Sequence, residues 1–243
     1  MHKGQAEAQA WCRRVAAALA LRPGRVVAVF PPFTALAAAR AGGAGGESLA
    51  LGAQDVYPAT AGAVTGEVGT DQLADLGVRF VLCGHSERRR LLGEDDALVA
   101  RKVAAALAAG MTPVVCVGED GPEREHGRTE AVLRRQVAGA VEGLGAEAVR
   151  RVVWAYEPVW AIGSGRPATP EQAAEAAATL RQSLRARYGA ALDGHEAPVL
   201  YGGSVDPENA AAFARAPGVD GALVGGASLD AEAFVTLVER VAP

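Results

Sequence analysis

The chain has 243 residues, half of them apolar, with a formal net charge of −4 and a pI of about 5.7. This charge balance excludes the basic surface expected of a protein that binds nucleic acid or an anionic membrane. No run of about 18 apolar residues is free of charge and no signal-peptide pattern opens the chain, so we expect neither a membrane span nor export.

The three cysteines, Cys12, Cys83 and Cys116, are an odd number in a chain of this length. Cys83 and Cys116 lie within apolar runs, which favours reduced core thiols over a disulfide framework. The cysteine spacing does not match a metal site. The sequence therefore predicts a cytoplasmic protein without disulfides or a bound metal.

Short apolar runs alternate with amphipathic stretches along the first part of the chain. At residues 5–21, apolar residues recur at the i, i+3, i+4 spacing of a helix. We predict helices at residues 5–21, 34–40 and 71–76, strands at residues 26–30, 49–53 and 79–83, and a long loop at residues 56–70.

The second part of the chain continues this alternation. We predict strands at residues 112–117, 151–156, 198–201 and 221–224, and helices at residues 95–109, 129–144, 169–188, 207–216 and 229–241. A polar loop is expected between Glu119 and the helix at 129–144. The predicted strands are nearly continuous apolar runs, as expected of strands that are buried on both faces of a sheet.

This order of elements predicts an α/β fold with a parallel sheet, because strands alternate with helices throughout. We count seven strands and eight helices, and no composition shift marks a domain boundary. A closed (β/α)8 barrel needs eight of each in about 250 residues. We therefore predict one domain over residues 1–243, a TIM barrel with its first strand missing from this chain.

One acid, Glu157, follows the predicted strand at 151–156 and precedes an apolar loop with a Gly-Ser-Gly sequence. The loop ends where Thr169 and Gln172 form a capping-box pattern around Pro170, which predicts a helix start. An acid at the carboxyl end of a strand beneath a glycine-hinged loop suits a catalytic base. An ordinary surface glutamate in a βα loop is the alternative reading.

Other unusual residues also follow strands, on the face where barrels of this class carry their active sites. His85 follows the strand at 79–83, Ser204 follows a Gly-Gly pair, and Gly225 and Gly226 follow the last strand. Glycine turns after the last two strands suit phosphate binding by backbone N–H groups. Tight turns and a satisfied loop histidine are the structural alternatives. Under either reading we expect Ser86 as a helix cap and Glu87 as an acid in the first helical turn.

Several segments resemble the triosephosphate isomerase family, and they occur in the family's order from one end of the chain to the other. The matching segments are GAQDV, GAVTGEV, CGHSERR, VVCVGE, AYEPVWAIGSGR, YGGSV and ALVGGASL. The resemblance implies that Glu157 moves a proton between C1 and C2 of dihydroxyacetone phosphate and D-glyceraldehyde 3-phosphate, while a neutral His85 polarises the carbonyl.

The same resemblance implies the remaining parts of the site. Residues 158–166 would be a closing loop, as in this family, where loop closure protects the reaction from water. Gly163, Ser204, Gly225 and Gly226 would bind the phosphate, and neither a metal nor a cofactor would be needed. The family is usually a homodimer, so residues 56–70 would insert into a partner copy, with Thr65 near the partner's active site.

The chain departs from the family's pattern at its start. The family begins with a strand that ends Asn-Trp-Lys-Met, whereas this sequence begins Met1-His2-Lys3. Two explanations stay open: a longer protein that starts upstream, or a chain without that Asn and Lys, which would be a catalytically impaired phosphate-binding barrel. A sugar-phosphate epimerase or a synthase of aromatic biosynthesis is a third reading, but such enzymes would not carry the EPVWAIGSG loop.

Smaller departures fall elsewhere. Val64 stands where Phe is common in the family, Ser164 replaces the usual Thr, and Arg166 replaces the usual Lys. Asp55 and Gly69 also differ from common choices. None of these positions has a proton-transfer role in the family.

Overall fold

The apolar runs of the chain form one parallel sheet in a computed structural model that describes residues 1–163 and 167–241. The sheet order follows the chain order, β1-β2-β3-β4-β5-β6-β7, and every neighbouring pair is parallel. The described strands are β1 (Ala28–Val29), β2 (Ala50–Ala53), β3 (Phe80–Cys83), β4 (Thr112–Val117), β5 (Val153–Tyr156), β6 (Val199–Tyr201) and β7 (Gly221–Ala222).

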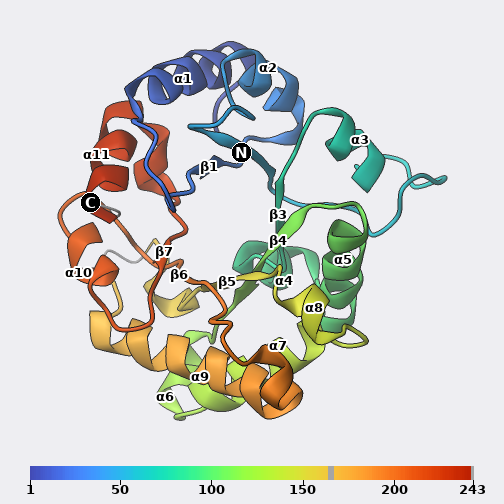
Figure 1. Cartoon of the computed structure of the whole chain (residues 1–243), viewed down its shortest axis with the longest axis vertical. Coiled ribbons are helices and arrows are strands. Elements are labelled where there is room, and N and C mark those ends of the chain that lie inside the picture. The colour runs from blue at the N-terminus through green and yellow to red at the C-terminus, as the bar shows by residue number, and fades with distance from the viewer. Residues whose placement is uncertain (164–166, 242–243) are drawn as a thin grey trace.

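Helices follow the strands and form a ring outside the curled sheet (Figure 1). The described α-helices are α1 (Gln5–Ala18), α2 (Leu36–Ala41), α3 (Thr70–Asp75), α4 (Ser86–Leu92), α5 (Asp96–Ala108), α6 (Gly121–Glu125), α7 (Thr129–Ala140), α8 (Ala146–Val149), α9 (Pro170–Tyr188), α10 (Ala210–Ala214) and α11 (Ala231–Val241). The 3₁₀ turns are η1 (Phe33–Ala35), η2 (Val159–Ala161), η3 (Gly189–Leu192) and η4 (Gly226–Leu229).

The architecture is that of an α/β TIM barrel, and the prediction of seven parallel strands is confirmed for the described residues. The prediction of eight helices is wrong, because α4, α6 and α8 are additional short helices. The polar loop expected after Glu119 contains α6, whose N-cap Asp120 forms a reciprocal capping box with Glu123. Local capping thus builds a helix where the apolar pattern is too short to indicate one.

Several predicted elements end earlier than expected. The helix predicted at residues 5–21 stops at Ala18, since Leu19 has an extended backbone conformation. The helix predicted at residues 129–144 stops at Ala140, three residues before Gly143. The first and last strands keep only two residues each, because each has a sheet partner on one side only among the described strands.

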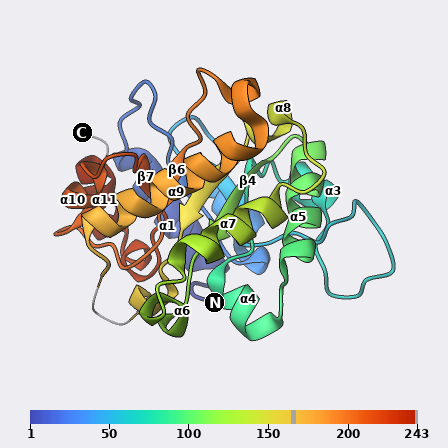
Figure 2. The same cartoon turned by 90° about the horizontal axis from the view of Figure 1, so that it is seen from below.

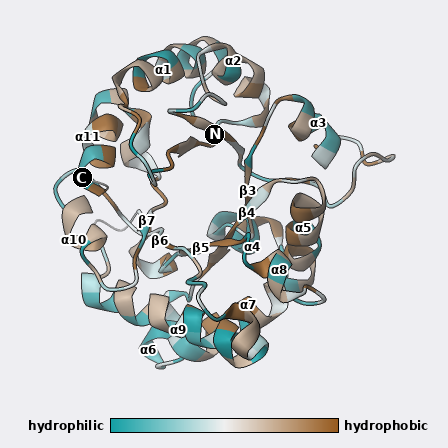
Figure 3. Cartoon of the chain, viewed as in Figure 1, coloured by the Kyte–Doolittle hydropathy of each residue, from teal (hydrophilic) through white to brown (hydrophobic). Residues whose placement is uncertain are grey.

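The core has two layers, one on each face of the sheet. On β4, Val115 and Val117 pack with the helices, while Val114 and Cys116 belong to a smaller cluster with Leu82 and Ala155. This alternation is the two-residue period of a strand, so the smaller cluster fills the inside of the curled sheet. Hydrophobic residues concentrate on the strands, and hydrophilic ones on outer helix surfaces such as those of α6 and α9 (Figure 3). Among the described helices, none is long and apolar enough to cross a membrane.

A buried ionic cluster lies beside the inner end of the long loop. Lys102 on α5 contacts the carboxylates of both Asp55 and Glu94, and all three side chains are at most 5% exposed. Arg88 on α4 reaches the same two acids, at 2.8 Å from Oδ2 of Asp55 and 2.5 Å from Oε1 of Glu94. Burial raises the pKa of Asp55, and the hydrogen bond and charge of Lys102 oppose that rise. The cluster joins the end of β2 to the helix α4.

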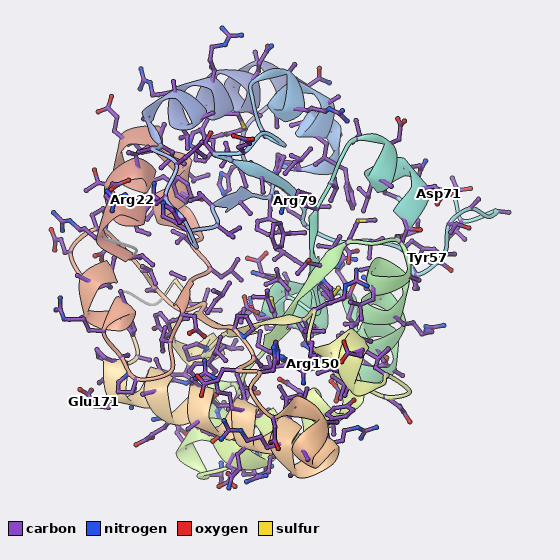
Figure 4. All side chains as sticks on the ribbon, viewed as in Figure 1. Arg22, Tyr57, Asp71, Arg79, Arg150 and Glu171 are labelled. Atoms are coloured by element: carbon purple, nitrogen blue, oxygen red, sulfur yellow. The ribbon has the colours of Figure 1, made fainter. Side chains whose placement is uncertain are left out.

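The long loop between β2 and α3 projects away from the barrel, as its ribbon shows (Figure 4). Residues 60–67 are exposed. Its base is held by backbone hydrogen bonds from Tyr57 N to Val68 O, at 2.8 Å, and from Thr70 N to Ala59 O, at 3.2 Å.

The first and last helices pack against each other. The rings of Trp11 on α1 and Phe234 on α11 have centroids 5.2 Å apart. Arg25, which lies between α1 and β1, pairs with Glu239 of α11 at 2.8 Å. These contacts join the two ends of the chain on the outside of the barrel.

Candidate active site

Glu157 stands at the carboxyl end of β5, as the sequence predicts. Its amide donates to the carbonyl oxygen of Val117 at 2.8 Å, so the sheet ladder between β4 and β5 extends to this residue. Glu157 is only 2% exposed, which excludes the alternative of a surface glutamate. A buried carboxylate needs hydrogen-bond partners.

His85 is the second residue after β3 and is the N-cap of α4. Its Nδ1 accepts a hydrogen bond from the backbone amide of Glu87 at 3.3 Å. The expectation that Ser86 caps this helix is wrong, because the imidazole takes that role and Ser86 is the first helical residue, whereas Glu87 lies in the first turn as expected. Since Nδ1 is an acceptor, the neutral ring carries its proton on Nε2.

The structure brings the two candidate catalytic side chains into direct contact. Nε2 of His85 lies 2.9 Å from Oε1 of Glu157, and Oε2 of Glu157 accepts a hydrogen bond from the amide of Ser86 at 2.8 Å. Both oxygens of the carboxylate are therefore held by the N-terminal turn of α4. Figure 2 shows α4 and α6 on the same side of the molecule, at the carboxyl ends of their preceding strands.

Burial and charge act in opposite directions on His85. Burial lowers the pKa of the imidazole, but the hydrogen bond and the negative charge of Glu157 outweigh it, so the pKa of His85 is raised from its ordinary value. The amide of Glu87 at Nδ1 favours the neutral ring, because a protonated Nδ1 would point its hydrogen at another donor. The protonation state of His85 therefore depends on what Glu157 contacts.

A third acid, Glu119, lies behind the base of the predicted closing loop, although the sequence does not single it out as a site residue. It is fully buried, and its Oε1 accepts hydrogen bonds from the Tyr156 hydroxyl at 3.1 Å and from Trp160 Nε1 at 2.9 Å. Burial, with the nearby Glu119 carboxylate, raises the pKa of Tyr156. Glu119 is the second residue after β4, but nothing in its own segment indicates its partners, which lie 37 and 41 residues away in the sequence.

The loop at residues 158–166, which is predicted to close over the site, has hydrogen bonds near both of its ends within the described residues. The hydroxyl of Ser204 donates to the carbonyl oxygen of Ala161 at 2.8 Å. The amide of Ala168 donates to the hydroxyl of Tyr201 at 3.1 Å, and Thr169 caps α9 in the predicted capping box with Gln172. Ser164 and Arg166, where the sequence departs from the family, lie outside the described residues.

The predicted phosphate ligands lie in the loops after β5, β6 and β7, and no hydrogen bond among the described residues joins one of the four directly to another. Ser204 follows β6 and contacts the closing loop, whereas Gly225 and Gly226 are exposed after β7. Gly163 has a left-handed backbone with φ of 65°. Within residues 1–163 and 167–241, the amides of Gly225 and Gly226 donate no hydrogen bond. Free amides at a glycine turn are suited to an anion.

Comparison with known proteins identifies the family. The model of the triosephosphate isomerase family matches residues 1–241. A triosephosphate isomerase of Nitratidesulfovibrio vulgaris is 49% identical over 241 residues, which is 98% of this chain and 95% of the relative. One from Symbiobacterium thermophilum is 46% identical over 242 residues, 100% of this chain and 94% of the relative, and one from Azoarcus sp. is 51% identical over 212 residues, 87% and 85% of the two. The chain belongs to the triosephosphate isomerase family.

Proposed function

We propose that the protein is an isomerase that interconverts dihydroxyacetone phosphate and D-glyceraldehyde 3-phosphate, a step of glycolysis and gluconeogenesis. The contact between Glu157 and His85 at the carboxyl ends of β5 and β3 carries this proposal. A carboxylate base beside an imidazole N–H donor is the pair of groups needed to move a proton next to a carbonyl. The family match over residues 1–241 supports it.

Glu157 is the base in this proposal. It takes a proton from C1 of the ketose, the C–H electron pair becomes the C1–C2 double bond, and the carbonyl oxygen gains negative charge. The proton of the C1 hydroxyl moves to the oxygen on C2, and returning the carbon-derived proton from Glu157 to C2 then gives the aldehyde at C1. The carboxylate must first leave His85 and the Ser86 amide, because both of its oxygens are occupied in this structure.

His85 stabilises the charge that develops on the substrate oxygen. Its Nε2–H, which now donates to Glu157, would donate to the carbonyl oxygen once the carboxylate has moved. A positioned donor in a buried site is worth several kcal/mol to a transition state, roughly 3–4 for a single oxyanion donor. The chemistry asks only for acid, base and hydrogen-bond donors, so the proposal includes neither a metal nor a cofactor.

Gly163, Ser204, Gly225 and Gly226 are the proposed phosphate ligands. Ser204 is already joined to the closing loop through Ala161, which would couple phosphate binding to the position of that loop. The comparisons do not favour the alternatives of an impaired phosphate-binding barrel or of an epimerase or synthase, because the named relatives are triosephosphate isomerases.

The direct test is the rate of interconversion of the two triose phosphates by the purified chain, compared with Glu157→Gln. We expect turnover by the chain and a loss of about 10²–10⁴-fold in kcat in the variant, with binding of a phosphate-bearing inhibitor largely retained. Glu171→Gln, at the exposed first turn of α9, is the matched control and should turn over normally. Near-normal kcat in Glu157→Gln would exclude Glu157 as the base.

The long loop is proposed to join two copies of the chain into a homodimer. Residues 60–67 are exposed on a projection, and Val64 presents an apolar side chain there. Loops of this length inside a compact domain are uncommon unless they are functional. We expect Val64→Asp to shift the chain from dimer to monomer in sedimentation velocity, while Leu21→Asp, an exposed position after α1, leaves the mass unchanged. A chain that is monomeric from the outset would contradict the proposal.

The cytoplasmic location stays a prediction. It is supported by the three cysteines, which are all free and buried.

A further inference from the structure

One polar side chain stands within the buried face of α7, away from the groups described above. Gln136 is 6% exposed and lies among buried Val132, Leu133 and Val137. Its amide makes two hydrogen bonds to one residue: Oε1 accepts from Gly118 N at 2.7 Å, and Nε2 donates to Gly118 O at 3.2 Å. Only a side chain with both a donor and an acceptor can make this pair of bonds.

Gly118 is the residue immediately after β4, and it lies against the backbone of Glu157. A Cβ atom at position 118 would stand 1.7 Å from the carbonyl oxygen of Glu157 and 2.5 Å from its carbonyl carbon. No side chain fits there, so the backbone of Gly118 is itself the wall beside Glu157. A movement of Gly118 therefore moves the residue that carries the carboxylate.

A second glycine stands on the other side of Glu157. The amide of Gly202 donates to Tyr156 O at 2.7 Å, and a Cβ atom at position 202 would lie 2.9 Å from Cγ of Glu157. Gly118 and Gly202 thus flank Glu157 with backbone atoms alone. Hydrogen bonds to the backbone must supply the precision that packing would otherwise provide.

Empty space adjoins the same segment. A cavity of ≈ 600 Å³ lies between the α4–α5 and α6–α7 regions, and its wall includes Gln136, Gly118 and Glu157. Close packing therefore does not fix Gly118 from this direction. The two hydrogen bonds between the Gln136 side chain and the Gly118 backbone join Gly118 to the helix α7.

We propose that Gln136 is a positioning residue for the reaction, which sets the location of the Glu157 carboxylate through the backbone of Gly118. This inference rests on the proposed role of Glu157 as the base. Gln136 does not touch the substrate. It keeps the end of β4, and with it Glu157, within the narrow range of positions that proton transfer from carbon requires.

The test uses two replacements of similar size. Gln136→Met removes both hydrogen bonds, and we expect kcat to fall about 10- to 100-fold at every pH, with KM changed by less than about threefold. Gln136→Glu has the shape of the amide. Its neutral carboxyl both donates and accepts, but its carboxylate cannot donate to Gly118 O, so kcat should fall as pH rises over the titration of the introduced carboxyl.

Matched replacements of Gln182, an exposed residue of α9 that accepts a hydrogen bond from Arg134, give the control. Gln182→Met and Gln182→Glu should have the kcat and the pH profile of the unaltered chain. Circular dichroism at each pH verifies that the variants compared are folded. If Gln136→Met does not fold, the Gln136→Glu profile decides the question alone.

The outcomes separate this inference from the proposed function. An unaltered chain without isomerase activity, or an active Glu157→Gln variant, overturns the role of Glu157 and the positioning role with it. The positioning role alone is overturned if the unaltered chain is active, Glu157→Gln is inactive, and Gln136→Glu keeps the kcat of the unaltered chain from about pH 5 to 9. A lowered kcat with nearly unchanged KM in the Gln136 variants supports it, because a role limited to stability would not divide the two constants in this way.

Discussion

Ser204 donates its hydroxyl hydrogen to the carbonyl oxygen of Ala161, 2.8 Å away. The bond joins the loop after β6 to the turn η2, at the start of the closing loop. Ser204, which is proposed as a phosphate ligand, therefore also holds the start of the loop at residues 158–166 by a hydrogen bond. Removing the hydroxyl tests both roles together.

Ser204→Ala is expected to weaken binding of a phosphate-bearing inhibitor by about 5- to 30-fold. A lost hydrogen bond of this kind is worth about 1–2 kcal/mol. Inhibitor affinity is measured by titration calorimetry. Ser183→Ala, which removes a bond to Thr179 O within α9, should leave affinity unchanged. Equal affinity of Ser204→Ala and the unaltered chain would remove Ser204 from the phosphate site.

His85→Gln is expected to reduce kcat by about 10²–10³-fold, because the variant loses the imidazole donor aimed at the substrate oxygen. Steady-state kinetics measures the effect. His126→Gln is the matched control, since His126 is exposed at the end of α6 and its ring is hydrogen-bonded to Pro122 O, far from the proposed site in the sequence. A His85→Gln variant within twofold of the control would show that the imidazole has no part in the reaction.

The His85–Glu157 contact predicts a pH dependence of stability. Because the pKa of His85 in the folded chain lies above its ordinary value of 6.5, the contribution of this pair is fully present below pH 6.5 and is lost as pH rises through the raised pKa. Glu157→Gln should therefore lower the pKa of His85 in an NMR titration. It should also lower the free energy of unfolding more at pH 5.5 than at pH 8.5. An unchanged imidazole pKa would contradict the contact.

Lys102→Met is expected to lower the free energy of unfolding by about 3–5 kcal/mol, because it leaves the buried carboxylates of Asp55 and Glu94 without their closest cation. Urea denaturation measures the loss. Arg134→Met breaks a more exposed pair with Glu130 on α7 and should cost at most about 0.5 kcal/mol. A loss of similar size in both variants would mean that the buried cluster adds nothing beyond a surface pair.

The sequence was sufficient for the parts of the molecule that local pattern determines. The apolar run at residues 112–117 predicts β4 at its observed bounds, and the Thr169 capping box predicts the start of α9. His85 and Glu157 were identified as candidates because each follows a strand. The 2.9 Å distance from His85 Nε2 to Glu157 Oε1 depends on how β3 and β5 are placed across the sheet, and so does the hydrogen bond from the Ser86 amide to Glu157.

The roles of other residues cannot be recognised from their own segment of the sequence. Gln136 reads as one polar position of an amphipathic helix, and nothing near it in sequence indicates that its partner is Gly118. Glu119 likewise gains its meaning from Tyr156 and Trp160, which lie 37 and 41 residues away in sequence. Such roles arise from contacts between segments, so periodicity and composition do not reveal them.

The packing of α1 against α11 has a consequence for the order of folding. Neighbouring strands follow one another along the chain, so each strand pairing closes only the loop of one βα unit. The bond between Arg25 and Glu239 spans 214 residues, and closing so long a loop costs more entropy than closing any single unit. We expect the contact between α1 and α11, which contains Trp11 and Phe234, to form last during folding and to open first in denaturant. The strands that precede His85 and Glu157 should separate later.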